Sequence, residues 1–397
     1  MRLVKVGLGS ISTTVGAVRS NVDRLIDVAR AMAADGVTIG VFPEQSVGGY
    51  PPEDLVQWRP FVAAQREQLL RFAAATEGVD TAFVLGVAVG VGGQLFNCAA
   101  VVHGGEVLGF VPKEKLPTYN VFYEGRNFSR GGAGLSLDAE GIPLGDYLFR
   151  FDFGTVAVEV CEDVWSPDGP LRRRAYSGAE LVLNVTSSPF RLGVVATRRE
   201  MLATRSADSQ VALAYVNGVG AQDGLIFDGG GFVCQNGRVV LAAPRFREGF
   251  ATAVVDLDRT LRLRQENTTW RSDCETFLRE SRPVPQIASG RGGADRSALR
   301  YPLAPGDGLF LPAPPPPDAP PPLSARDEAL DDLFAALSLG VKDYFRKTGA
   351  FRSLGIALSG GRDSMLTLLI AWRAAQLVHG LDDGVLGASE DVLRKVG

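Results

Sequence analysis

Segments with the pattern of strands and segments with the pattern of helices alternate along the first 243 residues, and this alternation limits the possible folds more than any other feature. Apolar residues with strand periodicity predict strands at 2–9, 37–44, 81–90, 156–160, 179–188 and 211–220. Apolar residues at helical spacing predict helices at 15–36, 58–76 and 200–210. Hairpins are predicted at 96–113 and 229–243, because each contains a short turn, at Gly104-Gly105 and Asn236-Gly237. Crossover units together with hairpins indicate an α/β protein with mixed sheets.

The composition argues against several classes of function. Acidic and basic residues are interspersed and leave a formal net charge of −4, which does not favour binding to nucleic acid or to a membrane surface. No apolar run approaches the length of a membrane span. The four cysteines are scattered without a CxxC pair and only two histidines are present, so we expect free thiols and no zinc site. These features predict a soluble, cytoplasmic protein.

One cysteine stands where a nucleophile would be placed. The segment VAVEVCEDVW predicts a buried strand that ends at Cys161, with acidic residues on both sides. Because neighbouring carboxylates raise the pKa of a thiol, a cation must offset them if Cys161 is to react. Two other predicted strands end in groups that could complete such a site, Glu44 in VFPEQ and Lys113 in VPKEKLPTY. Glu44 would accept the thiol proton, and Lys113 would stabilise the thiolate and then an oxyanion.

Each of these three residues also has an ordinary structural interpretation. Cys161 could be a small buried apolar residue, Glu44 a cap, and Lys113 a solvated charge on a loop. For any one of them alone, the structural interpretation is the more common one. The occurrence of all three at predicted strand ends favours a nucleophilic site.

The sequence around each of the three residues resembles a known family. The segments FPEQSVGGYPPEDL, KEKLPTYNVFYEGR and VEVCEDVW are similar to the Glu, Lys and Cys blocks of the nitrilase superfamily. More narrowly, they resemble the glutamine amidohydrolase domain of the glutamine-dependent NAD(+) synthetases, over roughly residues 1–279. The resemblance implies a four-layer α-β-β-α sandwich in which Glu44 is the general base, Lys113 the lysine on the oxyanion side and Cys161 the nucleophile. Lys113 is preferred to Lys115 because it has the K-x-x-L-P spacing.

The resemblance also implies which residues contact glutamine. One departure concerns Val194, which stands where the family usually has Lys or Arg; Arg191 is the nearby candidate to replace that charge. The glutamine-binding residues implied are Tyr119, Ser188, Glu124, Glu162 through its backbone N–H, and Arg191.

The composition changes near residue 281, which fits the two domains that 397 residues favour. Residues 281–324 are rich in proline and glycine, and PAPPPPDAPPP predicts an extended polyproline II spacer. The predicted organisation is an amidohydrolase domain at 1–280, a linker at 281–324 and a second unit at 325–397. The second unit has a predicted helix at 327–349, a strand at 353–359 and a helix at 365–380. Such a unit cannot close a domain, so we expect a poorly packed N-terminal fragment of a larger one.

The second unit carries a pattern suited to phosphate. In IALSGGRDS, two glycines and a helix N-terminus offer backbone N–H groups to an anion, and no GK[ST] is present. An ordinary glycine-rich turn with Asp363 or Ser364 as cap is the alternative. The segment resembles the pyrophosphate-binding loop of the ATP pyrophosphatases, a Rossmann-like adenine-nucleotide α-hydrolase fold, which implies ATP with Mg²⁺ and leaves the metal ligands unknown. The ATP-binding residues implied are Ser359, Gly360, Gly361, Asp363 and Ser364.

Together the two resemblances imply that ammonia from L-glutamine amidates nicotinic acid adenine dinucleotide in an ATP-dependent reaction that gives NAD(+), in a homo-oligomeric enzyme. Three alternatives stay open. The chain could be a free-standing nitrilase-type amidase, or a non-catalytic subunit that channels ammonia. It could also use its ATP loop in a different amidation or in tRNA thiolation.

Overall fold

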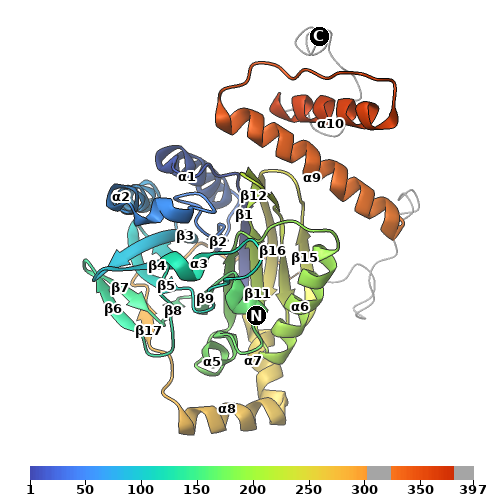
Figure 1. Ribbon diagram of the computed structural model, residues 1–397. Helices are drawn as coiled ribbons and strands as arrows, with labels where there is room; N and C mark the ends of the chain where they lie inside the picture. The colour runs from blue at the N-terminus through green and yellow to red at the C-terminus, as the bar shows by residue number, and fades with distance from the viewer. Residues whose placement is uncertain (302–322, 380–397) are drawn as a thin grey trace.

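Two β-sheets packed face to face form the centre of the molecule, and helices cover both outer faces (Figure 1). The computed structural model describes residues 1–301 and 323–379. The predicted four-layer α-β-β-α sandwich is confirmed. The covering helices are α1 (Val18–Ala34) and α2 (Arg59–Ala75) on the first sheet, and α5 (Leu171–Tyr176) and α6 (Val194–Asp208) on the second.

Both sheets mix parallel and antiparallel pairs, as the alternation of crossovers and hairpins predicted. The eight-stranded sheet has the order β16 (Gly249–Asp256), β1 (Leu3–Ser10), β2 (Ile39–Val41), β3 (Ala82–Val91), β4 (Gln94–His103), β5 (Glu106–Pro112), β7 (Ile142–Gly145), β6 (Ser136–Ala139). The seven-stranded sheet has the order β15 (Arg238–Ala243), β14 (Gly231–Gln235), β11 (Ala212–Asn217), β10 (Leu181–Thr186), β9 (Gly154–Val160), β8 (Leu148–Phe151), β17 (Gln286–Ala288). A separate hairpin is formed by β12 (Val219–Gln222) and β13 (Leu225–Asp228).

Three apolar cores lie between the four layers. Strand β9 shows how one sequence serves two of them, because successive side chains of a strand point to opposite faces. Val156, Val158 and Val160 pack between the sheets, and Ala157 packs under the helices of the second sheet. The remaining helices of the described residues are η1 (Glu53–Gln57, a 3₁₀ helix), α3 (Glu124–Asn127), α4 (Glu162–Trp165), α7 (Leu257–Glu266), α8 (Thr268–Glu280), α9 (Ala325–Thr348) and α10 (Arg362–Val378).

The direction of the central strands decides where polar groups meet. Strand β10 runs parallel to both β9 and β11, so the carboxyl ends of these three strands reach one edge of their sheet. Strand β2 is likewise parallel to β1 and β3 in the facing sheet. The residues that follow β2, β9 and β10 are therefore carried to a common region.

Two sequence-based expectations for the later part of the chain are wrong. Residues 353–359 form no strand, because none of the described strands pairs with them and an isolated strand leaves its backbone groups unbonded. The predicted linker begins with a structured element, since β17 pairs in parallel with β8 and completes the edge of the sheet. The expected polyproline II stretch at 312–322 lies outside the described residues.

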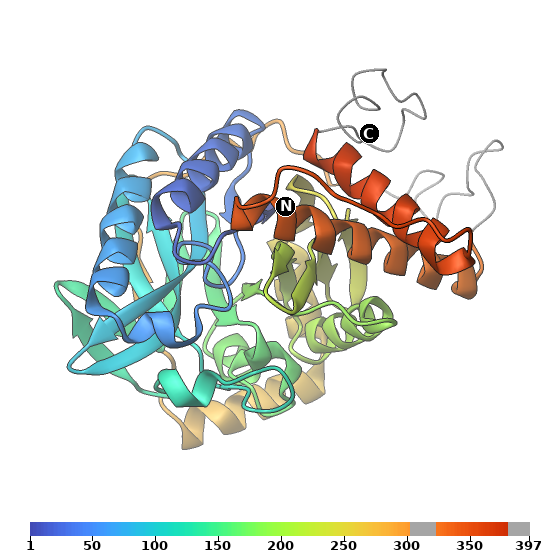
Figure 2. The same ribbon diagram turned by 45° about the horizontal axis from the view of Figure 1, so that its top comes forward.

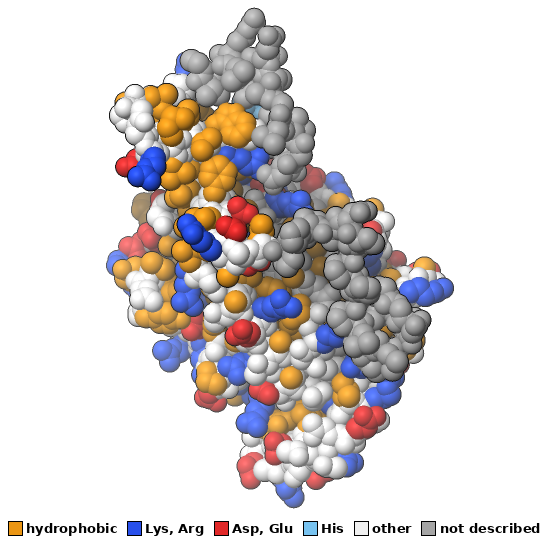
Figure 3. Space-filling model, turned by 90° about the vertical axis from the view of Figure 1, so that its right-hand side faces the viewer, with side chains coloured by type: hydrophobic (Ala, Val, Ile, Leu, Met, Phe, Trp, Pro, Cys, Tyr) orange, Lys and Arg blue, Asp and Glu red, His pale blue; other side chains and the backbone are white. Residues whose placement is uncertain are grey.

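The second unit is better packed against the first than we expected. Helix α9 lies along the β12–β13 hairpin (Figure 2), where Asp343 Oδ2 accepts a hydrogen bond from Ala221 N at 2.7 Å and Lys347 Nζ donates to Ala221 O at 2.7 Å. Helix α10 packs on α9. Apolar side chains remain on the surface of this unit (Figure 3). Met365 and Leu366 are among the exposed apolar residues of α10. Within the described residues, no helix combines the length and the apolar character needed to cross a membrane.

One buried carboxyl group in the second sheet has no hydrogen-bond partner. Glu159, on β9, is completely buried, and neither of its carboxyl oxygens is hydrogen-bonded among the described residues. The closest cation is Arg174, whose Nη1 lies 4.0 Å from Glu159 Oε1 but donates to Val158 O. Burial raises the pKa of Glu159 to about 8, against the opposing charge of Arg174. Glu159 is therefore a neutral carboxylic acid at neutral pH.

This group makes the stability depend on pH. Between the unfolded pKa and about 8, the unfolded chain loses this proton while the folded chain keeps it, so rising pH lowers the free energy of unfolding. We expect Glu159→Gln to raise the thermal midpoint above the parent's at pH 8.5 and to change it little at pH 5. The exposed Glu77→Gln is the matched control. An equal change in midpoint at both pH values would show that Glu159 carries no extra proton.

Candidate active site

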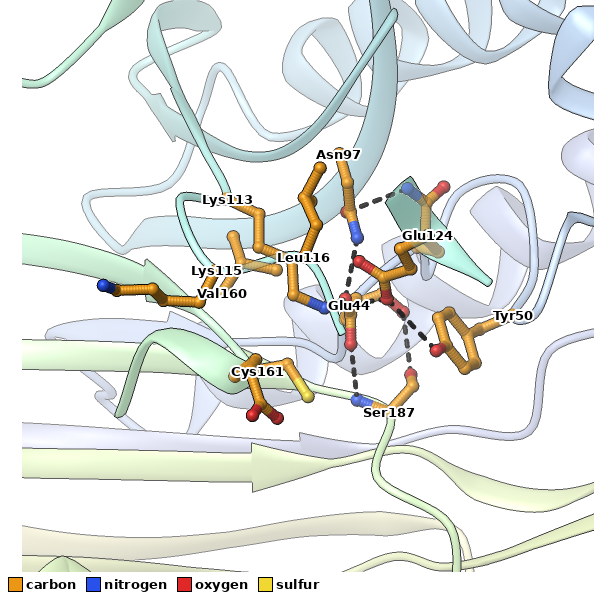
Figure 4. A network of polar contacts seen from close by, with 12 residues as sticks. Glu44, Tyr50, Asn97, Lys113, Lys115, Leu116, Glu124, Val160, Cys161 and Ser187 are labelled. Atoms are coloured by element: carbon orange, nitrogen blue, oxygen red, sulfur yellow. Dashed lines mark hydrogen bonds and ion pairs between the residues drawn. The ribbon is translucent and has the colours of Figure 1, made fainter. Parts of the chain in front are cut away.

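A buried lysine shared by two buried carboxylates forms the centre of the site (Figure 4). Lys113 Nζ donates to Glu44 Oε1 at 2.7 Å and to Glu124 Oε1 at 2.8 Å. The side chains of Lys113 and Glu44 are fully enclosed, and that of Glu124 is nearly so. Burial alone lowers the pKa of Lys113, but Glu124 and Glu44 outweigh it and raise that pKa well above its ordinary value. Lys113 is therefore a permanent ammonium ion.

Neutral donors add hydrogen bonds to the two carboxylates, and Glu124 Oε2 is left buried without a hydrogen-bond partner among the described residues. Glu44 Oε1 accepts a second hydrogen bond from Asn97 Nδ2 at 2.7 Å, and Glu44 Oε2 accepts one from Ser187 N at 3.1 Å. Tyr50 Oη donates to Glu124 Oε1 at 3.2 Å. Burial raises the pKa of Glu124 to about 7, although Lys113 opposes this shift. The hydrogen bonds leave Glu44 held in one orientation, as a positioned base requires.

The chain reaches this geometry through a close backbone approach. Glu44 follows β2, and its neighbour on β3 is Gly86, whose N–H donates to Pro43 O at 3.1 Å. A Cβ atom at Gly86 would lie 2.1 Å from Gln45 N and 2.5 Å from Glu44 Cα. Only glycine at this point of β3 lets the chain at Glu44 lie against the sheet.

Asp163 joins the lysine segment to the cysteine strand. Its Oδ1 accepts hydrogen bonds from Glu114 N at 3.0 Å and Lys115 N at 2.8 Å, and its Oδ2 accepts one from Val160 N at 3.1 Å. Asp163 is buried, and burial raises its pKa to about 6. Asp163, which the sequence places close to Cys161, therefore has a structural role, because it holds the Lys113 segment and the Cys161 strand together.

Cys161 lies at the sharp turn between β9 and α4. Its φ is +44° and its ψ −98°, an unusual backbone conformation for a residue with a side chain, of the kind found at functional turns. Its N–H donates to Val185 O at 2.9 Å, and its sulfur is directed toward Glu44 and Ser187 (Figure 4). Burial and then Glu44 raise the thiol pKa well above its ordinary value, against the effect of Lys113. The resting side chain is a protonated thiol.

Two of the predicted glutamine contacts lie at the outer side of the thiol. Tyr119 Oη donates to Glu162 Oε1 at 2.9 Å, and half of the Tyr119 side chain is exposed. Glu124 and Tyr50 also line a surface pocket with the segment from Val121 to Tyr123. This pocket therefore reaches the Glu124 end of the buried cluster.

The remaining predicted glutamine-binding residues, Ser188 and Arg191, differ in their surroundings. Ser188 is buried directly after β10, beside the Ser187 that holds Glu44. The Arg191 side chain is exposed and makes no hydrogen bond or ion pair among the described residues, while Val194 is buried. The guanidinium that reaches Ser188 belongs to Arg198, whose Nη2 donates to Ser188 O at 3.0 Å. Lys115, the alternative lysine, is partly exposed, 3.8 Å from Asp168.

Sequence reasoning missed Asn97, Ser187 and Arg198, although signals for two of them were present. The predicted hairpin at 96–113 pairs residues about its turn and so places Asn97 next to Lys113, whose N–H donates to Asn97 O at 2.8 Å. Arg198 lies four residues after Val194 and therefore on the same face of α6. Ser187 could not be distinguished from Ser188 by sequence.

The predicted ATP loop lies on the second unit and is exposed. Ser364 Oγ donates to Gly361 O at 2.8 Å at the start of α10, and Gly360 has a φ of +80°. No cluster of three His, Cys, Asp or Glu side chains able to hold a metal ion occurs in the part of the chain that the structure describes. The exposed loop residues are Ser359, Gly360, Gly361 and Asp363, with Ser364 partly covered.

Comparisons with known proteins agree with the first unit's fold and extend to the second. Curated glutamine-dependent NAD(+) synthetases match nearly the whole chain: the one from Thermotoga maritima is 33% identical over 94% of this chain, and the one from Aquifex aeolicus 30% over 93%. The chain spans 59% and 58% of the length of these two relatives.

Solved structures give the same result. The glutamine-dependent NAD(+) synthetase from Acinetobacter baumannii, solved with ADP, superposes on 94% of this chain with a TM-score of 0.67 and 27% identity, and this chain covers 57% of it. An amidase from Nesterenkonia AN1 superposes on 68% of this chain with a TM-score of 0.54 at 23% identity, and 96% of that amidase is covered, which shows a shared fold. The model of the carbon-nitrogen hydrolase family matches residues 5–265. The chain therefore belongs to the carbon-nitrogen hydrolase family.

Proposed function

We propose that the first unit hydrolyses the side-chain amide of L-glutamine and thereby supplies the ammonia used by a glutamine-dependent NAD(+) synthetase. The observation that carries this proposal is the buried Glu44–Lys113–Glu124 cluster against the Cys161 thiol, at the ends of strands from two facing sheets. The match of almost the entire chain to curated NAD(+) synthetases supports glutamine, rather than a simple amide, as the substrate.

The mechanism follows from the protonation states of the site. As the Cys161 sulfur attacks the amide carbon, Glu44 accepts the thiol proton, which avoids a free thiolate whose formation burial disfavours. The carbonyl oxygen becomes an oxyanion, which the Lys113 ammonium and the backbone N–H of Glu162 stabilise. Glu44 then returns the proton to the departing nitrogen, ammonia leaves, and a thioester on Cys161 remains.

In the second half of the reaction, the thioester on Cys161 is hydrolysed. Water replaces ammonia, and Glu44 removes a proton from it as it attacks the thioester carbon. The tetrahedral intermediate collapses, glutamate leaves, and the proton returns to the Cys161 sulfur. Glu124 keeps Lys113 aligned throughout, because it accepts the second hydrogen bond of the ammonium at 2.8 Å.

Substrate recognition is proposed for the residues near Cys161 that do not take part in proton transfer. We infer that Tyr119, whose hydroxyl donates to Glu162, and the buried Ser188 would contact the amino-acid end of glutamine. Arg191 is exposed and close in sequence to Ser188, so it would reach the substrate carboxylate only from solvent.

The second unit is proposed to take part in the ATP-dependent amidation of nicotinic acid adenine dinucleotide. The loop at Ser359–Ser364 would hold the pyrophosphate of ATP through its backbone N–H groups. The described residues do not fit a resident Mg²⁺ site, because they include no cluster of three His, Cys, Asp or Glu side chains. A cytoplasmic homo-oligomer remains part of the proposal.

Substrate preference tests this function most simply. We expect the purified chain to release ammonia from L-glutamine with a kcat/KM at least about tenfold above that for propionamide, because contacts to the amino-acid end are made only by glutamine. Ammonia release is measured with a coupled glutamate dehydrogenase assay in both cases. Equal efficiency with propionamide would instead support a free-standing amidase.

The two lysines of the KEK segment offer a matched pair for the catalytic assignment. Lys113→Met should lower kcat for glutamine by about 10²-fold or more, because it removes the charge next to the oxyanion. Glu44→Gln should also lower kcat by about 10²-fold or more, because it removes the general base. Lys115→Met is the matched control for Lys113→Met, since it removes the same charge from a partly exposed position, and it should leave kcat near the parental value. A larger loss at Lys115 than at Lys113 would overturn the assignment, provided that circular dichroism shows all variants folded.

A further inference from the structure

We propose that a chain of ionic contacts links helix α9 to the peptide segment that holds Glu44, so that the seating of α9 sets the alignment of the base. The chain runs from Asp332 on α9 through Arg245, Asp228 and Arg198 to the Ser187–Ser188 segment. These are positioning residues, because none of them touches the reacting thiol. The kinetic part of the inference rests on the proposed function.

The inner end of this chain of contacts is the backbone at the end of β10. Ser187 N donates to Glu44 Oε2 at 3.1 Å, and Ser187 Oγ donates to Glu44 O at 2.9 Å. Any displacement of this segment therefore moves a donor of the Glu44 carboxylate.

Two buried side chains hold the next residue, Ser188, from behind. Ser188 N donates to Asn217 Oδ1 at 2.8 Å, and Asn217 Nδ2 donates back to Ser188 O at 3.1 Å. Arg198 Nη2 adds a third hydrogen bond, to Ser188 O at 3.0 Å. Because both the N–H and the C=O of Ser188 are hydrogen-bonded, the orientation of the backbone at Ser188 depends on Asn217 and Arg198.

Asp228 is the common partner of both side chains. It is fully buried at the end of β13, and it accepts hydrogen bonds from Arg198 Nη1 at 2.7 and 2.8 Å and from Asn217 Nδ2 at 3.0 Å. Removing a partner from a buried, hydrogen-bonded charge is costly, so Asp228 and Arg198 move together.

Arg245 carries the linkage out of the first unit. It follows β15, its Nη1 lies 3.6 Å from Asp228 Oδ2, and its Nη2 donates to Asp332 of α9. Helix α9 also holds the β12–β13 hairpin through Asp343, and that hairpin ends at Asp228. Asp228 is therefore connected to α9 both through Arg245 and through the hairpin backbone.

The outer two residues allow a test that does not unfold the buried pair. We expect Asp332→Asn and Arg245→Gln to speed amide hydrogen exchange in a peptide covering 184–190 by about 2- to 30-fold, the range of typical coupling free energies. The control is Asp331→Asn, which makes the same change at an exposed neighbour on α9 whose side chain has no hydrogen bond or ion pair among the described residues. It should exchange like the parent.

Kinetics provide the second measurement. Asp332→Asn and Arg245→Gln should lower kcat for glutamine by about 2- to 30-fold with little change in KM, and should cause no further loss when Glu44 is already Gln. Loss of equal size in the Glu44→Gln background would indicate a merely structural role and overturn the linkage. Unchanged exchange at 184–190 would overturn it whatever the activity. Faster exchange in a chain that hydrolyses no amide would refute the proposed function and support the linkage.

Discussion

The arrangement of the site depends on one buried ammonium group. Lys113 Nζ is enclosed by protein and bonded to Glu44 and Glu124, two carboxylates that would otherwise repel each other. Removing one partner of a buried ion pair is costly, because the other charge is then left buried without compensation. Asn97, Ser187 and Tyr50 provide further donors to the two carboxylates and hold them in place around the ammonium group.

Each of the two facing sheets contributes part of the site. The eight-stranded sheet contributes Glu44 and Lys113, and the seven-stranded sheet contributes Cys161 and Ser187. The apolar core between the sheets keeps these groups at a fixed separation, because packed interiors transmit small shifts rather than absorb them. Asp163 adds a direct connection, since its carboxylate accepts backbone hydrogen bonds from both sides of the site.

The elements that carry the site residues could be predicted from the sequence. Features that depend on partners distant in the sequence could not. The strands before Glu44, Lys113 and Cys161 could be predicted because local periodicity and flanking residues define them. The strand expected at 353–359 is absent, since a strand also requires a neighbour that no local pattern supplies. The task of Asp163 and the isolation of Glu159 depend on which backbone groups and cations the fold brings near, which the spacing of acids around Cys161 does not reveal.

The proposed mechanism requires Cys161 to form the covalent bond to glutamine. Its most direct test is mass spectrometry of the chain after rapid acid quenching during turnover with L-glutamine. We expect a γ-glutamyl adduct on the peptide that contains Cys161, and none in the Cys161→Ala variant. Turnover without an adduct on Cys161, or an adduct on Cys98, Cys234 or Cys274, would contradict this mechanism.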